Sequence, residues 1–375
     1  MLSTAATLCA ETSLMRIRSA SGEYRVRFCK SFSVLSPQIL SSDPTHLLVD
    51  GKIYRTYGNW IRRWIPPGKI LSVRASETQK SLEQIPRLIE ALLRMGIRKN
   101  SVLLVIGGGV IQDLGCFIAS VLFRGIRWNF VPTTLLAQAD SCIGGKSSIN
   151  LAHQKNPIGT FHPPCEIWVC PIFLQTLPND QYRSGVGEII KLLWIRDVRE
   201  FSRMMRRELA SDVPRKNVFQ ILALIRQSLQ TKKKYIEKDE FDVGPRRILN
   251  FGHTFGHAFE SMTRYAIPHG VAVTLGMVAA SFFSEFFFQG PRGCFAQTRR
   301  LCFPWFHPYQ QKFLRLSPFK VVQCMAKDKK NRNHKIQLIL PDARGKPQLA
   351  KPCDKALLLR GLRKFFYAMN AYHLP

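Results

Sequence analysis

The sequence predicts an α/β domain followed by a mainly helical domain. Up to about residue 177, short apolar or alternating runs are separated by turns that contain glycine and proline, which is typical of strands in an α/β fold. Beyond that point, longer runs with a period near 3.6 residues indicate helices. A length of 375 residues also favours two domains. We therefore expect an N-terminal extension at 1–22, an α/β domain at 23–177 and a helical domain at 178–375.

The predicted α/β domain alternates strands and helices. Apolar residues recur near the helical period between 76 and 95, and Ser81 is the expected N-cap of that helix. The elements that we expect, in order, are strands within 23–50, a helix at 59–64, a strand at 69–73, a helix at 76–95, and strands at 102–106 and 130–136.

Three glycines, Gly107–Gly109, connect strand 102–106 to a helix that begins near Val110. A strand, a glycine turn and a helix present backbone N–H groups and a helix N-terminus to a phosphate. The dinucleotide fingerprint GxGxxG is incomplete, because Gln112 stands where its third glycine belongs. Taken alone, the turn is equally compatible with a plain tight connection.

A second glycine-rich segment ends at Lys146, after a strand that closes on the hydroxyls of Thr133 and Thr134. It is similar to a P-loop, but that motif requires glycine at position 140, where the chain has Asp140. A nucleoside-triphosphatase site is therefore disfavoured. The two remaining interpretations are a loop that delivers Lys146 to an anion and a solvated turn.

The predicted helical domain contains one very apolar segment at 271–288. Thr274, Ser284 and Glu285 interrupt it, so we interpret it as a buried core helix and not as a membrane span. The full set of expected helices is 182–195, 198–209, 218–235, 253–265, 271–288 and a closing helix at 357–366.

Histidines are concentrated in the helical domain. His253 and His257 are four residues apart and share one helix face, so that both could bind one divalent metal, and His269 follows. Glu188 lies in an apolar helix three residues before Lys191, where a buried carboxylate requires a cation; a surface ion pair is the alternative. Catalytic zinc takes three protein ligands, so four candidates leave one histidine for proton transfer. The segment HTFGH lacks the glutamate of HExxH metalloproteases, which disfavours a peptidase.

The charge and cysteine content limit the class of protein. The chain has 55 Lys and Arg against 25 Asp and Glu, a net charge of +30, which attracts polyanions. The basic residues are scattered and no zinc-finger or RNP signature is present, so nucleic-acid binding is not the expected function. The ten cysteines form no CxxC pair and the N-terminus lacks a secretory signal. We expect a cytoplasmic protein with reduced thiols and no membrane association.

A series of motifs occurs in a fixed order over roughly residues 23–345. They are SETQKS at 76–81, GGGVIQD at 107–113, RGIRW at 124–128, VPTTLLAQADSCIGGKSSIN at 131–150, KNPIGTFHPP at 155–164, LQTLP at 174–178, GVGEIIK at 185–191, KDE at 238–240, RRILNFGHTFGHAFE at 246–260, HGVAVTLGM at 269–277 and KDKK at 327–330. This series resembles the 3-dehydroquinate synthase family, within the sugar-phosphate cyclase superfamily.

The resemblance implies a Rossmann-like N-terminal domain that binds NAD, a mainly helical metal-binding C-terminal domain, and a homodimer. The implied metal is divalent, usually zinc with cobalt as the alternative, held by Glu188, His253 and His269, with His257 left as the acid/base residue. The implied NAD-binding residues are Glu77, Lys80, Gly108, Gly109, Asp113, Thr133, Thr134, Phe173 and Thr176, with Lys146 and Lys155 shared between cofactor and substrate. The implied substrate-binding residues are Asp140, Lys146, Asn156, Lys191, Lys232, Arg246, Asn250 and Lys329, with Arg124 at the substrate phosphate.

The implied activity is 3-dehydroquinate synthesis in the shikimate pathway of aromatic amino acid biosynthesis. 3-Deoxy-D-arabino-heptulosonate 7-phosphate, a phosphorylated sugar acid, is oxidised by NAD, loses phosphate, is reduced again and closes by an aldol reaction. NAD is regenerated, so the enzyme is a lyase. The alternatives are another cyclase that makes an inosose, a valiolone or an amino analogue, a metal-dependent polyol dehydrogenase, and a non-catalytic polyanion-binding protein.

Several residues depart from the family pattern, among them Asn179–Asp180, which replace a more usual Arg-Glu pair, and Pro245 just before Arg246. Gln112 stands where the family usually has a small residue beside the NAD pyrophosphate, and we expect it to weaken or reshape cofactor binding. Cys142 replaces a serine and Cys170 an aspartate. None of these changes removes a metal ligand or a substrate-binding cation, so we expect an active enzyme.

Overall fold

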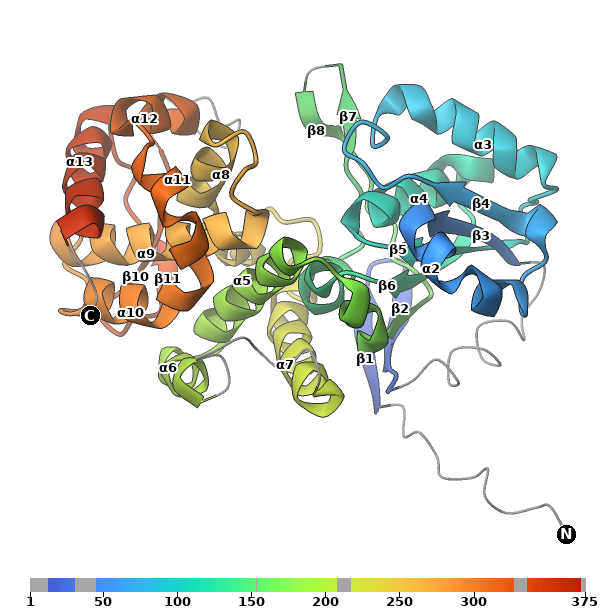
Figure 1. The fold of residues 1–375 in the computed structure, drawn as a ribbon, viewed down its shortest axis with the longest axis horizontal. Helices are drawn as coiled ribbons and strands as arrows, with labels where there is room; N and C mark the ends of the chain where they lie inside the picture. The colour runs from blue at the N-terminus through green and yellow to red at the C-terminus, as the bar shows by residue number, and fades with distance from the viewer. Residues whose placement is uncertain (1–12, 31–44, 153, 208–216, 327–335, 372–375) are drawn as a thin grey trace, which may run out of the picture. The chain divides into compact units, whose positions relative to one another are not determined.

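The computed structural model describes residues 13–30, 45–152, 154–207, 217–326 and 336–371 (Figure 1). The chain forms two compact units, which are described separately. The first comprises Met1–Leu177, Pro214–Leu229 and Ile236–Phe241, and the second comprises Pro178–Val213, Gln230–Tyr235 and Asp242–Pro375. Helix α7 (Val218–Ile236) therefore contributes residues to both units.

The first unit is built on a seven-stranded sheet, which confirms the predicted Rossmann-like α/β class. Its order is β1-β2-β9-β6-β5-β3-β4, and every neighbouring pair is parallel except β1 and β2. The strands are β1 (Ser13–Ser19), β2 (Gly22–Phe28), β3 (Thr45–Asp50), β4 (Ile70–Val73), β5 (Val102–Gly107), β6 (Arg127–Pro132) and β9 (Glu166–Val169).

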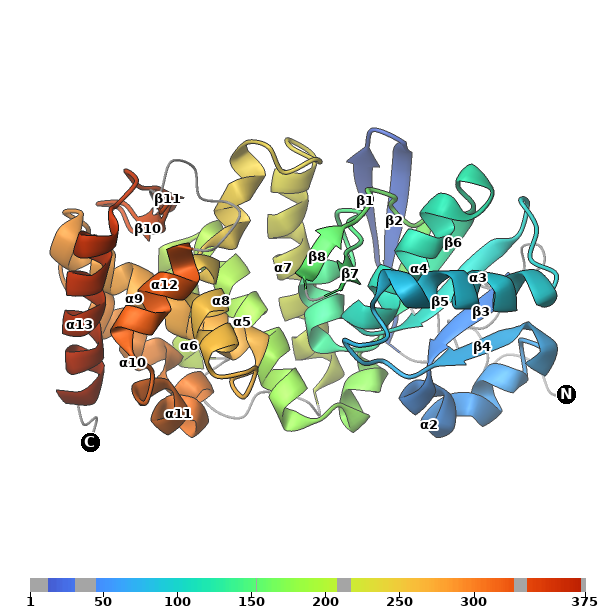
Figure 2. The ribbon, with the colours of Figure 1, turned by 90° about the horizontal axis from the view of Figure 1, so that it is seen from above.

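Helices cover both faces of this sheet, because its central strands are apolar on both sides. Helix α2 (Gly51–Arg62) packs on the face formed by Leu47, Leu104 and neighbouring buried residues. Helix α4 (Gly109–Val121) packs on the other face, so closely that a Cβ at Gly115 would lie 2.4 Å from Val105. Helix α3 (Ile85–Arg94) lies on the opposite side of β3 and β4 from α2 (Figures 1 and 2).

Four local expectations for the first unit are corrected. The strand expected at 130–136 is β6, which ends at Pro132, and residues 135–136 already belong to the helical segment that contains Ala137–Ser141. Part of the expected N-terminal extension is strand β1. Buried and exposed residues alternate along this strand, and the buried ones, Met15 and Ile17, pack against the sheet. The helix expected at 59–64 is the end of α2, which begins at Gly51 behind the N-cap Asp50. The helix expected from 76 starts as a 3₁₀ turn, η3 (Leu82–Gln84), and the Ser81 side chain forms no capping hydrogen bond.

Short elements complete the first unit. A π-helix, η5 (Ala137–Ser141), follows β6, and strands β7 (Ile149–Leu151) and β8 (Gln154–Ile158) form a separate hairpin. The 3₁₀ helix η6 (Pro171–Thr176) follows β9, and η4 (Leu122–Arg124) follows α4.

The second unit is mainly helical, as predicted. Its other elements are α5 (Asn179–Arg196), α6 (Val198–Arg207), η7 (Pro245–Asn250), α8 (His253–Met262), α9 (His269–Phe287), α10 (Cys294–Phe306), η8 (His307–Tyr309), α11 (Gln310–Leu314), α12 (Pro318–Ala326), α13 (Lys355–Ala371) and the hairpin of β10 (Ile339–Pro341) and β11 (Pro347–Leu349).

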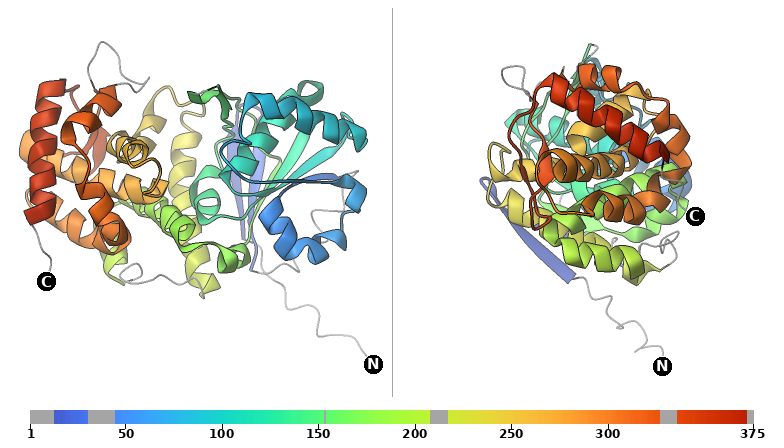
Figure 3. Two further views of the ribbon diagram at one scale, coloured as in Figure 1. Left: turned by 45° about the horizontal axis from the view of Figure 1, so that its top comes forward. Right: turned by 90° about the vertical axis from the view of Figure 1, so that its left-hand side faces the viewer.

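Helix α9 forms the core of this second unit. By length and composition it could cross a membrane, but 83% of its apolar window is buried inside the protein. Its Phe283 packs so tightly against α13, drawn in red in Figure 3, that a Cβ at Gly361 would lie 2.4 Å from the ring. The interpretation of the segment 271–288 as a core helix is therefore confirmed.

Candidate functional site

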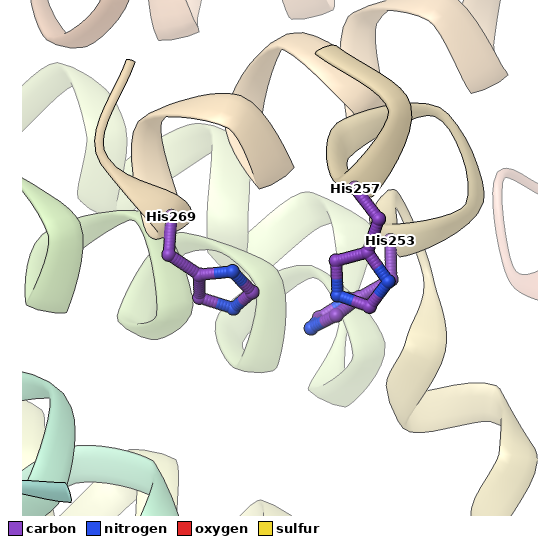
Figure 4. Close-up of side chains that lie close together, drawn as sticks. All are labelled: His253, His257 and His269. Carbon is purple, nitrogen blue, oxygen red and sulfur yellow. The ribbon is translucent and has the colours of Figure 1, made fainter. Parts of the chain in front are cut away.

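The second unit brings together a carboxylate and three imidazoles, here called the histidine–carboxylate cluster: Glu188, His253, His257 and His269. His253 and His257 come from the first turns of α8 and His269 begins α9 (Figure 4), while Glu188 lies on α5. Glu188 Oε1 is 3.1 Å from His269 Nε2 and 3.4 Å from His253 Nε2. The three residues expected to bind metal thus meet at one point.

The spacing of these three atoms suits a metal ion. Two ligand atoms at about 2.0–2.1 Å from a tetrahedral ion lie about 3.3 Å apart. The observed separations from Glu188 bracket this value. Glu188 is 1% exposed, and among the described residues neither of its carboxylate oxygens has a well-directed hydrogen bond. Glu188 forms an ion pair with Lys191, and its other oxygen faces the two imidazole nitrogens, an arrangement that fits a divalent ion such as zinc.

Glycines next to the three ligands make this convergence possible. A Cβ at Gly187, beside Glu188, would lie 2.0 Å from the carbonyl oxygen of Gly270, the neighbour of His269. A Cβ on Gly276 of α9 would lie 1.9 Å from the carbonyl oxygen of Gly252, the neighbour of His253. Only glycine permits such approach of helix backbones, so these contacts place the three side chains within ligand distance.

A second set of contacts orients the two histidine ligands. His269 Nδ1 is 3.0 Å from Glu260 Oε2, and His253 Nδ1 is 3.2 Å from the carbonyl oxygen of Phe251. A metal-bound histidine commonly donates its other ring N–H in this way, which holds the nitrogen that faces the metal free of a proton. The sequence analysis did not single out Glu260, although it lies one turn after His257 on the same helix face.

His257 is close to both other histidines. Its ring centroid is 5.1 Å from that of His253 and 5.6 Å from that of His269. The ligand atoms of the three histidines all lie within 4.8 Å of one another. His257 is therefore part of the cluster. These distances are compatible both with metal binding by His257 and with proton transfer by it.

Charge interactions in the cluster oppose the effect of burial. Burial alone would raise the pKa of Glu188, but Lys191, which forms an ion pair with it, and His253 hold that pKa well below its usual value. Burial and Lys191 lower the pKa of His253. Burial alone would lower the pKa of His269, but its contacts with Glu188 and Glu260 raise it to about 10.

In the first unit, steric contacts explain why glycine is needed in the turn between β5 and α4. A Cβ at Gly108 would lie 2.7 Å from Thr134 Cγ2, whereas a Cβ at Gly109 would meet no atom within 4 Å. The backbone of Gly107 also pairs with the next strand, since its carbonyl oxygen accepts from Thr133 N at 2.9 Å. The turn is thus packed on one side and open on the other, at the N-terminus of α4, as a phosphate site requires.

Polar residues beside this turn form a connected set, here called the Lys80 network. Lys80 Nζ donates to Asp113 Oδ2 at 3.1 Å and to Asn156 Oδ1 at 2.9 Å. Asn150 Nδ2 donates to Glu77 Oε1 at 2.9 Å, and Asn156 N donates to Asn150 Oδ1 at 3.0 Å. Asp113 also accepts from the backbone N and the hydroxyl of Ser148, at 3.1 Å and 2.9 Å. Asn156, which we expected to bind the substrate, therefore belongs to the same hydrogen-bond network as Glu77, Lys80 and Asp113, which we expected to bind NAD.

The remaining residues expected to bind NAD lie around this turn and on η6. Thr134 Oγ1 accepts from Ala137 N at 3.2 Å, which stabilises the start of η5. Phe173 is 2% exposed and packs edge-on against Tyr57. Thr176 is exposed, and its hydroxyl lies 3.3 Å from that of Tyr57.

The expected substrate-binding residues are distributed over both units. Asp140 on η5 is half-buried, whereas Lys146 is exposed, with its Nζ 5.6 Å from the centroid of the Phe161 ring. Arg124 is exposed, at a positive φ of 63°. Four more residues belong to the second unit, where Lys191, Lys232 and Arg246 are buried and Asn250 is half-buried. Lys155 is exposed on β8, and Lys329 lies outside the described residues.

The departures from the family pattern are accommodated inside the first unit. Gln112 is 4% exposed and its side chain is bonded to Ser141. Cys142 Sγ donates to the carbonyl oxygen of Gln138 at 3.5 Å. Cys170 is fully buried beside Cys29, and burial raises the pKa of both thiols to about 12. All nine cysteines in the described part of the chain are free.

Comparison with protein families matches two consecutive segments of the chain. Residues 70–184 match the family described as 3-dehydroquinate synthase N-terminal, and residues 185–331 match 3-dehydroquinate synthase C-terminal. A 3-dehydroquinate synthase of Alkaliphilus metalliredigens is 35% identical over 336 residues, which cover 84% of this chain and 88% of the relative. A 3-dehydroquinate synthase of Dictyoglomus thermophilum is 36% identical over 302 residues, 78% of this chain and 82% of the relative.

Solved structures share the fold at lower identity. A 2-deoxy-scyllo-inosose synthase complexed with carbaglucose-6-phosphate, NAD+ and Co2+ has a TM-score of 0.81 at 23% identity, covering 94% of this chain and 99% of that chain. A 2-epi-5-epi-valiolone synthase from Streptomyces hygroscopicus with NAD+ and Zn2+ bound has a TM-score of 0.79 at 22% identity, covering 92% and 97%. A probable glycerol dehydrogenase from Sinorhizobium meliloti has a TM-score of 0.58 at 13% identity, covering 88% and 92%.

Proposed function

The chain belongs to the 3-dehydroquinate synthase family, and we propose that it converts 3-deoxy-D-arabino-heptulosonate 7-phosphate to 3-dehydroquinate and phosphate. The observation that carries this proposal is the match to both family domains over residues 70–331, in a chain whose Glu188, His253 and His269 meet at ligand distance. The protein is a lyase, because the substrate is oxidised only transiently and phosphate leaves.

NAD and a divalent metal are the cofactors of this reaction. The two cyclase structures that share the fold contain NAD+ together with Co2+ or Zn2+. When bound, NAD accepts and returns a hydride and the metal polarises a substrate oxygen. The open glycine turn fits the phosphates of NAD, and the buried carboxylate of Glu188, which faces two imidazole nitrogens, fits the metal.

In the second unit, we assign metal binding to Glu188, His253 and His269. His257 is then the residue that accepts and donates protons at a ring nitrogen, a role that contributes about 10²–10⁴-fold in rate. Its proximity to the other two histidines supports this role, because proton transfer must occur beside the polarised oxygen. Buried Lys191, Lys232 and Arg246, together with Asn250, are assigned to the substrate.

In the first unit, NAD binding is assigned to the glycine turn and the residues around it. Backbone N–H groups at Gly108 and Gly109 suit the cofactor's phosphates. The other residues assigned to NAD are Glu77, Lys80, Asp113, Thr133, Thr134, Phe173 and Thr176. Asp140, Asn156, Arg124 and Lys329 are assigned to the substrate, and Lys146 and Lys155 are shared between NAD and substrate, since lysine and arginine bind carboxylate and phosphate through charge-assisted hydrogen bonds.

We further propose that the enzyme is a cytoplasmic homodimer. The family resemblance supports a homodimer, and the free, buried thiols support a reducing compartment. Elution at the mass of one chain in size-exclusion chromatography with light scattering would argue against the homodimer.

Two alternative activities of this protein can be distinguished from the proposed one by experiment. The 2-deoxy-scyllo-inosose synthase structure holds carbaglucose-6-phosphate, while the glycerol dehydrogenase shares the fold at a lower TM-score. A cyclase of another specificity would release phosphate from a different sugar phosphate. A polyol dehydrogenase would accumulate NADH from an unphosphorylated polyol, which the proposed reaction does not.

The test is phosphate release by the purified protein with NAD and zinc. We expect phosphate from the heptulosonate phosphate without accumulation of NADH, and none after the metal is removed with a chelator. Glucose 6-phosphate serves as the comparison substrate, because carbaglucose-6-phosphate is its analogue. No phosphate release from the heptulosonate phosphate at saturating NAD and zinc would refute the proposed function.

A further inference from the structure

Gln112 lies in the first turn of α4, and its side chain reaches the last residue of the π-helix η5. Its Nε2 donates to the carbonyl oxygen of Ser141 at 2.7 Å, and its Oε1 accepts from the Ser141 hydroxyl at 2.7 Å. Gln112 is 4% exposed and Ser141 is half-buried. We call this pair of hydrogen bonds the Gln112–Ser141 clasp.

The clasp supports a backbone conformation that needs external partners. A π-helix is rare, and the last carbonyls of any helix have no partner within it. The π-helix ends at Ser141, and the chain continues through Gly144 and Gly145, both at positive φ. A side-chain amide has a donor and an acceptor, which matches the carbonyl and hydroxyl of Ser141; a carboxylate or an aliphatic side chain does not.

The neighbouring residue of α4 holds the other end of the same loop. Asp113 accepts from the backbone N of Ser148 at 3.1 Å and from its hydroxyl at 2.9 Å. Two consecutive helix residues thus fix both ends of the segment 141–148. Asp140 directly precedes the end held by Gln112.

We propose that Gln112 is a positioning residue that fixes the turn carrying Asp140, and thereby the binding of substrate, and that it is not a contact of NAD. The inference rests on the proposed function, in which Asp140 belongs to the substrate site. It replaces the sequence-based expectation that residue 112 acts on the cofactor, because the amide is bonded to Ser141. A displaced catalytic-site group costs up to about a hundredfold in rate.

The experiment compares Gln112→Ala and Gln112→Glu with Ser120→Ala, a control that removes a hydrogen bond within α4 to Phe117 and leaves the loop untouched. We expect Gln112→Ala to lower kcat/KM for the heptulosonate phosphate about tenfold, while the Kd for NAD, measured by calorimetry, changes less than about twofold. Gln112→Glu should lower kcat/KM further, because a carboxylate would face the Ser141 carbonyl oxygen. In an Asp140→Asn background, Gln112→Ala should add almost nothing.

A second readout does not depend on activity. Hydrogen exchange of the NAD- and zinc-loaded protein should become faster at 137–142 in Gln112→Ala and stay unchanged at 147–150, where Asp113 holds the chain. Unchanged exchange at 137–142, or weaker NAD binding with unchanged substrate kinetics, would overturn the proposal. If the wild-type protein releases no phosphate, the proposed function fails, while the exchange comparison still decides whether the clasp holds the turn.

Discussion

The Lys80 network of the first unit and the histidine–carboxylate cluster of the second unit differ in what each lacks. Lys80 donates to Asp113 at 3.1 Å and to Asn156 at 2.9 Å, and Asp113 accepts two further hydrogen bonds from Ser148. Glu188, in contrast, is buried against two imidazoles without a well-directed hydrogen bond among the described residues. The first arrangement is held by hydrogen bonds among its own side chains, whereas in the second Glu188 pairs with Lys191 and faces two imidazoles at the spacing of metal ligands.

This difference means that substitutions should act differently in the two units. In the first unit, the polar side chains hold loops in place, and losing one leaves the others paired. In the second unit, the backbone contacts of glycines force the ligands together, and the metal offsets the cost of burying a carboxylate. Metal should therefore rescue changes in the second unit and have no effect on changes in the first.

The largest expected effect separates two histidines within the cluster. His253→Ala should lose the bound metal, because one of three ligands is removed, and with it all measurable turnover. His257→Ala should retain one metal per chain and lose about 10²–10⁴-fold in kcat, because only proton transfer is removed. Metal content by atomic emission and phosphate release check both variants. Equal metal loss in the two would contradict the assigned roles.

A comparison of two lysines tests the difference between the units directly. Lys191→Met should destabilise the metal-free protein by about 3–5 kcal/mol, since Glu188 loses its buried ion-pair partner. Lys80→Met should cost about 1–3 kcal/mol, because Asp113 keeps both hydrogen bonds from Ser148. Urea unfolding with and without zinc measures both. Zinc should restore much of the lost free energy of unfolding in Lys191→Met but not in Lys80→Met. Equal recovery of stability in both variants would contradict the proposed difference between the two units.

Glu260 provides a sharper test of how the cluster holds its ion. Glu260→Gln should weaken zinc binding about 10–100-fold, because the acceptor that orients His269 loses its charge. Glu285→Gln is the matched control, since Glu285 accepts from the backbone N of Gly293 and Phe295 in the same unit. Competition with a chromophoric chelator gives both affinities. A zinc affinity unchanged in Glu260→Gln would exclude this orienting role.

The affinity for zinc should rise with pH. The pKa of His269 in the metal-free cluster is raised to about 10 by Glu188 and Glu260, against the lowering effect of burial. The ring is therefore protonated between pH 6 and pH 8, and zinc must displace that proton. We expect affinity to increase by about tenfold per pH unit in this range. Glu260→Gln should flatten this dependence, and a pH-independent affinity in the wild type would contradict the prediction.

The smallest expected effect concerns the glycine turn. Gly108→Ala should destabilise the protein by about 1–3 kcal/mol, because its Cβ would lie 2.7 Å from Thr134. Gly109→Ala should change stability by less than about 0.5 kcal/mol, because that Cβ meets no protein atom, yet it should weaken NAD binding. Thermal unfolding and calorimetry distinguish the two. Similar stability losses would show that the turn is packed on both sides.

The spacing of apolar residues predicted the fold class, because it indicates which side chains of a strand or helix are buried. Strands 102–106 and 130–136 and the core helix at 271–288 were recognisable from their apolar patterns, and the observed elements differ from these ranges by a few residues. Strand β1 was missed, although Met15 and Ile17 alternate with polar residues, because a short pattern does not say whether a partner strand exists. The steric reason for the glycines at 187 and 252 was also hidden, since it depends on a distant helix.

The sequence by itself therefore determined the two-part architecture, the family, and the residue types available to hold a metal and a nucleotide. The tertiary structure decided which of them meet. Glu188 reaches His253 and His269 because glycine-lined helices pack at backbone distance, Glu260 turns to His269, and Gln112 turns to Ser141 instead of the glycine turn. The physical reason is that secondary structure follows from neighbours along the chain, whereas a site depends on side-chain orientations that only packing between distant segments selects.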